Sequence, residues 1–154
     1  MTRKSSLGQL SVALGELDRM GQTMEVGIFG RRRHTRGSQP ELAQLLAWHE
    51  YGTSKAPARA PIRTYMENEG PAEIGARAAA VLPPVLRGET DPVEALEAIG
   101  QLAAQGVRKA IARGLPPPLK NPRASGNTGP PLDDYGQMMR AVTVKIDGKV
   151  KRRI

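Results

Sequence analysis

Hydrophobic residues recur at steps of three and four in four stretches of the chain, and this spacing predicts amphipathic helices. In the second stretch, for example, Leu42, Leu45, Leu46 and His49 share one face. The predicted helices are residues 6–20, residues 39–51, a stretch from 61 or 71 to 82, and residues 92–113.

Helix-capping and helix-breaking residues define the ends of these stretches. Asp91-Pro92 is a cap followed by proline at the first helical position, and Gly52 ends the second helix. Pro83-Pro84 is expected to break the third helix, because proline lacks the amide hydrogen that an interior helical position donates. The proline- and alanine-rich stretch 53–61 is expected to be extended.

Alternating apolar and polar residues predict a small sheet. Residues 23–29 place Met24, Val26 and Ile28 on one side of a strand, and residues 141–146 alternate in the same way. Asp147-Gly148 is a hairpin turn that leads into a basic strand, residues 149–154. The sequence therefore predicts one α+β domain over residues 1–154, with an antiparallel sheet of roughly three to five strands packed against three to four helices.

Composition adds a long irregular segment and a shortage of large side chains for the core. Gly (17) and Pro (13) make 30 of 154 residues, against an average share of about 12%. Residues 115–131 hold six prolines, which predicts a long loop or arm. The aromatic residues are Phe29, Trp48, Tyr51, Tyr65 and Tyr135. So few aromatics favour a domain whose stability is completed by partner subunits.

The sequence offers no constellation for enzyme chemistry. There is no cysteine, and no serine lies in a nucleophile-elbow motif. His49-Glu50 lacks the second histidine of a zinc-protease motif, since that position is Thr53. The alternative is a partly buried histidine beside a surface glutamate. We therefore expect no catalytic residues, no metal, no cofactor and no small-molecule substrate.

The chain is strongly basic, with 23 Lys and Arg against 15 Asp and Glu and a formal net charge of +8. Some of these basic residues form two clusters, one within residues 31–36 and one at residues 151–153. Clusters of this kind neutralise phosphates or acidic protein surfaces. Neither cluster contains the interleaved aromatics on which single-stranded bases stack, so a contact with nucleic acid would involve the backbone only. A contact between subunits or simple solvation remains the alternative. The clustered residues are Arg31, Arg32, Arg33, Arg36, Lys151, Arg152 and Arg153.

The stretch 48–63 combines two aromatics with a proline-stiffened segment, since Trp48 and Tyr51 precede Pro57, Arg59 and Arg63. Prolines lower the entropic cost of docking an extended arm on a partner. A connection between two helices, packed on the domain's own core, explains the same residues equally well.

The N-terminus is basic but has no continuous apolar segment behind it, so we expect mature sequence without a signal peptide. No apolar run approaches the roughly 20 residues of a membrane-spanning helix, and no membrane partner is expected.

The order of several short motifs resembles a family of bacteriophage proteins. It runs from Val26-Gly-Ile-Phe through His49-Glu-Tyr-Gly-Thr and Pro57-Ala-Arg to Gly114-Leu-Pro-Pro and Leu132-Asp-Asp-Tyr-Gly-Gln-Met138. Across residues 24–146 the chain is similar to the small neck, or tail-completion, proteins of long-tailed phages.

The resemblance implies a structural virion protein, assembled in the host cytoplasm, that forms a ring (a hexamer) at the head–tail junction. Such a ring completes the tail tube, docks it to the head connector and lets double-stranded DNA pass through its lumen. The alternative from another class is a small basic DNA-binding or packaging accessory protein. The expected subunit contacts are Trp48, Tyr51, Pro57, Arg59, Arg63, Leu115, Pro117, Leu132 and Asp134.

Overall fold

The computed structural model describes residues 23–31, 40–118 and 136–151, and it confirms the α+β class. Within these residues three antiparallel strands lie in the order β1-β2-β3, and five helices accompany them. The strands are β1 (Met24–Gly27), β2 (Thr143–Ile146) and β3 (Lys149–Lys151). The helices are α2 (Leu42–Tyr51), α3 (Pro61–Glu67), α4 (Gly70–Leu86), α5 (Pro92–Ala112) and α7 (Gln137–Ala141).

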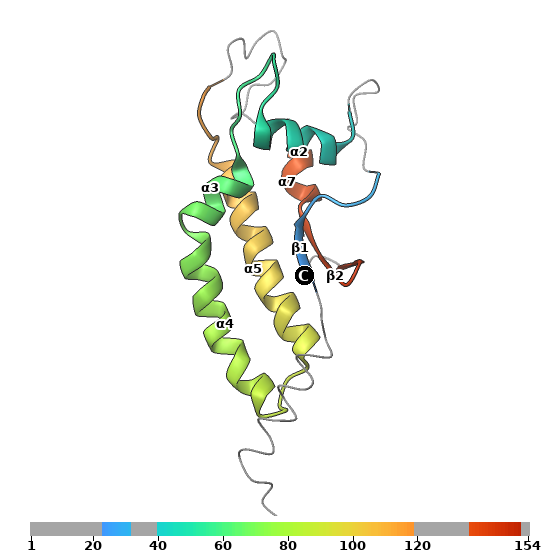
Figure 1. Cartoon of the computed structure of the whole chain (residues 1–154), viewed down its shortest axis with the longest axis vertical. Coiled ribbons are helices and arrows are strands. Elements are labelled where there is room, and N and C mark those ends of the chain that lie inside the picture. The colour runs from blue at the N-terminus through green and yellow to red at the C-terminus, as the bar shows by residue number, and fades with distance from the viewer. Residues whose placement is uncertain (1–22, 32–39, 119–135, 152–154) are drawn as a thin grey trace, which may run out of the picture.

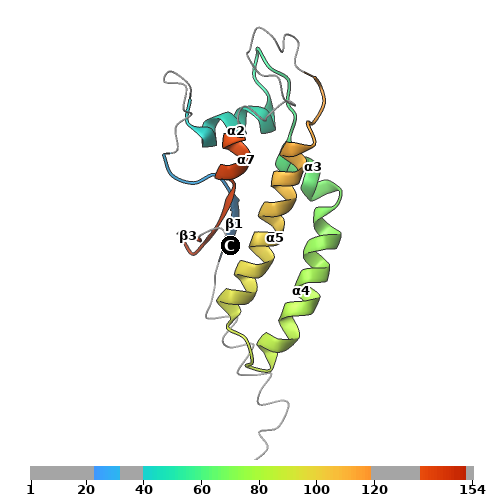
Figure 2. The same ribbon diagram turned by 180° about the vertical axis from the view of Figure 1, so that it is seen from behind.

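The elements form an elongated molecule with α5 at its centre (Figure 1). Helices α4 and α5 run side by side along the long axis, and the sheet lies on the other side of α5. Helix α2 crosses the upper end above α7, as the view from behind also shows (Figure 2). This arrangement leaves the outer face of α2 at one end of the molecule.

The sheet is built as the alternation predicts. Glu25 pairs with Lys145 across β1 and β2, and their side chains form an ion pair of 2.7 Å. The Asp147-Gly148 turn has positive φ at both residues (47° and 73°), the geometry of a tight hairpin. The Asp147 carboxylate also accepts a hydrogen bond of 3.2 Å from the amide of Thr23, which fixes the start of β1 beside the turn.

Helix α5 begins where the sequence predicts, because the Asp91 carboxylate accepts hydrogen bonds from the amides of Val93 (2.7 Å) and Glu94 (3.4 Å). Two glycines then allow close packing on opposite partners. A Cβ on Gly100 would lie 2.6 Å from Val144 of the sheet, and one on Gly106 would overlap the ring of Tyr65 from α3. Helix α5 therefore packs against the sheet and against α3 through positions that tolerate no side chain.

The expected break at Pro83-Pro84 is wrong, because α4 continues through both prolines to Leu86. The carbonyls that lose their donors belong to Ala79 and Ala80, which lie on the exposed side of the helix. Water can satisfy these oxygens, so the cost of the missing hydrogen bonds is small there. The third predicted helix is in fact two, and both expected starting points, Pro61 and Pro71, lie in the first turn of a helix.

Other predicted elements lie partly or wholly outside the described residues. These are the helix 6–20, most of the segment 115–131 and the end of the strand 149–154. Among the described helices, none combines the length and the apolar character that crossing a membrane requires.

Candidate interaction surface

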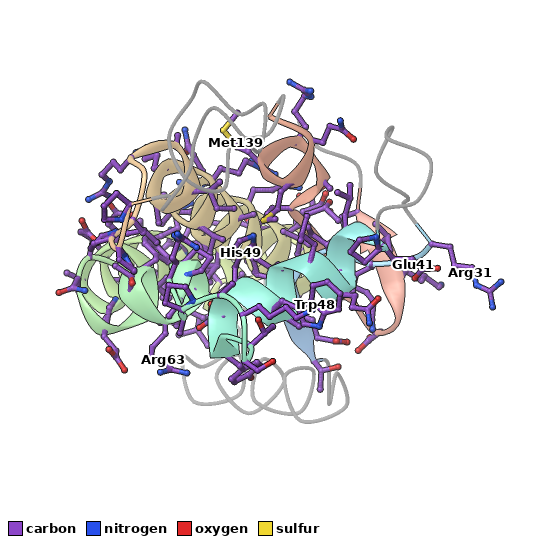
Figure 3. All side chains as sticks on the ribbon, turned by 90° about the horizontal axis from the view of Figure 1, so that it is seen from above. Arg31, Glu41, Trp48, His49, Arg63 and Met139 are labelled. Carbon is purple, nitrogen blue, oxygen red and sulfur yellow. The ribbon has the colours of Figure 1, made fainter. Side chains whose placement is uncertain are left out.

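Helix α2 has one face in the core and one face in solvent. Leu42 and Leu46 are buried one turn apart, whereas Trp48 keeps 42% and Tyr51 keeps 76% of its surface exposed. Viewed from above, Trp48 lies on the outer side of α2 and His49 lies toward the centre (Figure 3). We call Trp48 and Tyr51 the α2 aromatic pair.

The segment after α2 is a closed connection and not the extended stretch that its prolines predict. The Thr53 amide donates to the carbonyl of Ala56 (2.8 Å), and the Thr53 hydroxyl accepts from the amides of Lys55 and Ala56. The chain then returns to α2, where the amides of Arg59 and Ala60 donate to the carbonyl of His49 (2.7 and 2.9 Å). Of the two alternatives for this segment, the helix-to-helix connection describes its backbone.

Gly52 makes this return possible. It has φ of 78°, and a Cβ at this position would lie 2.9 Å from the amide nitrogen of Ala58. A side chain at residue 52 would therefore push the connection away from the end of α2.

Arg59 links the connection to the start of the proline-rich segment. Its side chain is 7% exposed, and its guanidinium donates to the carbonyls of Pro117 (2.9 Å) and Pro118 (3.5 Å). The connection after α2 and the residues that follow α5 both lie at the upper end of the molecule (Figure 1). Arg59 and Pro117, both expected at a subunit contact, are thus bonded to each other within one chain, and their role toward a partner stays a prediction.

Glu50 is buried, which corrects its interpretation as a surface residue. Its carboxylate accepts hydrogen bonds of 3.0 Å from the amides of both Ile62 and Arg63, in the first turn of α3. Helix α3 has no capping side chain of its own, because Ala60 precedes Pro61. Glu50 therefore supplies the N-cap from the preceding helix. Its carboxylate also lies 3.9 Å from the guanidinium of Arg63, which is exposed.

His49 is partly buried, as expected, and its Nδ1 has no hydrogen-bond partner among the described residues. Burial, with the nearby positive charge of Arg59, lowers the pKa of His49 to about 4. The imidazole is therefore neutral at pH 7. Within the described residues no group of three His, Cys, Asp or Glu side chains is placed to hold a metal ion.

The basic residues differ in how far they are already paired. Arg31 is exposed and points away from the body of the molecule beyond Glu41 (Figure 3). Lys151 instead forms an ion pair of 3.1 Å with Glu97. Of these two cations, Lys151 therefore has an ion-pair partner among the described residues. The remaining ones, Arg32, Arg33, Arg36, Arg152 and Arg153, lie outside the described residues.

The other expected contact residues are spread over the molecule. Pro57 is exposed in the connection after α2, and Leu115 packs against the core. Leu132 and Asp134 lie outside the described residues.

The motif search missed two structural roles, those of Glu50 and Tyr65. Tyr65 is 1% exposed, and its hydroxyl donates to Glu73 (3.1 Å). Burial, with this hydrogen bond, raises the pKa of Tyr65 to about 12. A proline at the first position of a helix without a preceding cap is the sequence signal that could have pointed to a remote cap such as Glu50.

Comparison of the chain with protein-family models, with curated proteins and with solved structures found no match.

Proposed function

We propose that this chain is a structural virion protein whose copies form a ring at the head–tail junction of a long-tailed phage, completing the tail tube and docking it to the head connector. The observation that carries the proposal is the exposure of the α2 aromatic pair. Of the four aromatics in the described residues, these two are the exposed ones, since Tyr51 keeps 76% and Trp48 keeps 42% of its surface in solvent. Tryptophan and tyrosine are enriched in the buried centres of protein interfaces.

The support beneath the α2 aromatic pair is rigid, which favours association. The carbonyl of Trp48 accepts from Gly52, and the carbonyl of His49 accepts from Arg59 and Ala60. The Glu50 carboxylate ties the same turn to α3. A surface held in one conformation loses little entropy on binding, so more of the burial energy appears as affinity.

A ring needs two different complementary surfaces on each copy, since an identical pair of patches would close a dimer. The α2 aromatic pair is one candidate surface, and the described start of the proline-rich segment, the exposed residues 116–118, is a candidate for the other. Aromatic side chains bind proline-rich segments well, because such segments are already extended. Identical copies in a closed ring satisfy both surfaces.

The test measures assembly and DNA binding on the same preparations. Electron microscopy of the purified chain is expected to show rings with an open centre. A Trp48→Ala/Tyr51→Ala variant is expected to show none. The control is Leu82→Ala. Leu82 lies on α4 and is 40% exposed, so this substitution removes an exposed apolar side chain away from the α2 aromatic pair, and the rings should persist.

The alternative function, that of a DNA-binding accessory protein, is tested by a gel shift of this chain with a random duplex at two salt concentrations. Its affinity for DNA should fall steeply with salt, because counterion release drives such binding. A monomer that shifts duplex DNA, with no rings under any condition, would replace the ring proposal by this alternative.

A further inference from the structure

A groove of about 540 Å³ runs along the solvent-facing side of α5. Its floor is one face of the helix, because its lining residues recur at steps of three and four from Ala98 to Ala112. Arg77 of α4 and Met139 of α7 form its two walls. The fourteen residue steps of this floor correspond to roughly 21 Å.

Among the described residues that line the groove, the ionised side chains are cations, namely Arg77, Arg108 and Lys109. Arg108 donates to the carbonyl of Val142 (2.9 and 3.2 Å), which holds its charge at one wall. Arg77 and Lys109 are exposed, and neither forms an ion pair with another described residue. The described part of the groove therefore carries the positive charges of Arg77 and Lys109 without an anion among its described lining residues.

Apolar side chains lie between these cations. Leu102 and Met139 are half-buried, and the floor between Ala98 and Ala112 is mixed, because the amide side chains of Gln101 and Gln105 also line it. The phosphates of DNA offer no apolar group to cover Leu102 and Met139, and the described lining contains no aromatic side chain on which a base could stack. An aliphatic side chain flanked by carboxylates matches both the floor and the walls.

We infer that this groove binds an acidic amphipathic segment of a partner protein. Carboxylates of the segment face Arg77 and Lys109, and its aliphatic side chains pack on Leu102 and Met139. A helix of about fourteen residues, or an extended strand of six or seven, spans the floor.

The groove is separate from the α2 aromatic pair. Met139 lies on the opposite side of the molecule from Trp48 in the view from above (Figure 3). The inference therefore does not rest on the proposed ring. A single copy and an assembled one would both present the groove.

The test uses the full chain and a fluorescein-labelled fourteen-residue peptide with leucine and glutamate at helical spacing. Fluorescence anisotropy is expected to show saturable binding that weakens with salt. Arg77→Glu/Lys109→Glu should weaken binding at least about tenfold, since two attractive charge contacts become repulsive. The milder Arg77→Gln/Lys109→Gln should weaken it less, and circular dichroism checks that each variant is folded.

The matched control is Lys55→Glu/Lys149→Glu, which changes the net charge equally at two exposed sites outside the groove. It should leave the affinity within about twofold. The inference is overturned if this control loses as much affinity as the groove variant. It is equally overturned if the same peptide with lysine in place of glutamate binds as well, if a short DNA duplex displaces the acidic peptide, or if the groove variants change the oligomeric mass.

Discussion

The packing around α5 and the surface of α2 use side chains of the same kinds in opposite ways. At α5, the Tyr65 ring lies against Gly106 and is 1% exposed, and its hydroxyl reaches Glu73. At α2, Trp48 and Tyr51 lie on a helix whose C-terminal carbonyls accept hydrogen bonds from the following connection, yet their side chains stay exposed (42% and 76%). The Tyr65 side chain is therefore buried within the single chain, whereas the side chains of the α2 aromatic pair remain exposed in it.

The small number of aromatic residues has different consequences at the centre of the fold and at its upper end. The centre of the fold compensates for small side chains by bringing backbones close, as Gly100 does against Val144. The upper end buries its aromatics only in part and so exposes apolar surface, which the proposed ring would cover. Substitutions around α5 should therefore change folding, and substitutions in the α2 aromatic pair should change association.

The largest effect is expected at Gly106. Gly106→Ala places a methyl group in the Tyr65 ring and should lower the free energy of unfolding by about 3 kcal/mol. Urea denaturation measures this loss. Gly75→Ala is the matched control, since Gly75 lies within α4 with open space around it. This control should gain about 0.5–1 kcal/mol, because alanine is the better helix former. Equal effects at the two glycines would contradict the close packing at Gly106.

The next effect is a pH dependence that belongs to His49. Its pKa is about 4 in the folded chain and near 6.5 when unfolded, so between these values the unfolded state binds more protons. Stability should therefore fall as the pH is lowered from 6.5 toward 4. Because the ring is only partly buried, we expect this loss to be about 1–2 kcal/mol. Urea midpoints at pH 7 and 4.5 should show a smaller decrease for His49→Gln, and an identical decrease would contradict the prediction.

Removing the remote cap should have a similar or slightly smaller effect. Glu50→Ala leaves the amides of Ile62 and Arg63 without their acceptor and should cost about 1–2 kcal/mol. Thermal unfolding measures this loss. Glu67→Ala is the control, because Glu67 is exposed at the end of the same helix, and it should change stability by less than about 0.5 kcal/mol. The cap is refuted if both variants melt at the same temperature as the parent.

The smallest effect on folding is expected at the α2 aromatic pair. Tyr51→Ala should lower the free energy of unfolding of the single chain by less than about 0.5 kcal/mol, since the side chain is 76% exposed. The same variant should weaken self-association measurably in sedimentation velocity. A large loss of stability with unchanged association would reverse the comparison between the two regions.

The sequence predicts elements whose ends carry their own signals. Asp91-Pro92 begins α5, Asp147-Gly148 forms the hairpin, and Gly52 ends α2, because each acts on its own neighbours in the chain. The α+β class follows from the same local patterns.

The errors arise where distant contacts or solvent decide the outcome. The segment 53–61 is closed because the carbonyl of His49 accepts from Arg59 and Ala60, which no local pattern reveals. Helix α4 passes Pro83 and Pro84 because the affected carbonyls face solvent. The burial of Glu50 likewise depends on where α3 packs. Among the site residues, the exposure of the α2 aromatic pair could have been predicted from spacing, since Trp48 and Tyr51 lie on the side of the helix opposite Leu42 and Leu46.

The mass of the purified chain in solution tests the central claim most directly. Light scattering over a range of protein concentrations, at low and at high salt, should give a closed oligomer of defined mass that persists at high salt, and Trp48→Ala/Tyr51→Ala should give a single-chain mass. A parent chain that stays at 16.6 kDa under every condition would contradict the claim.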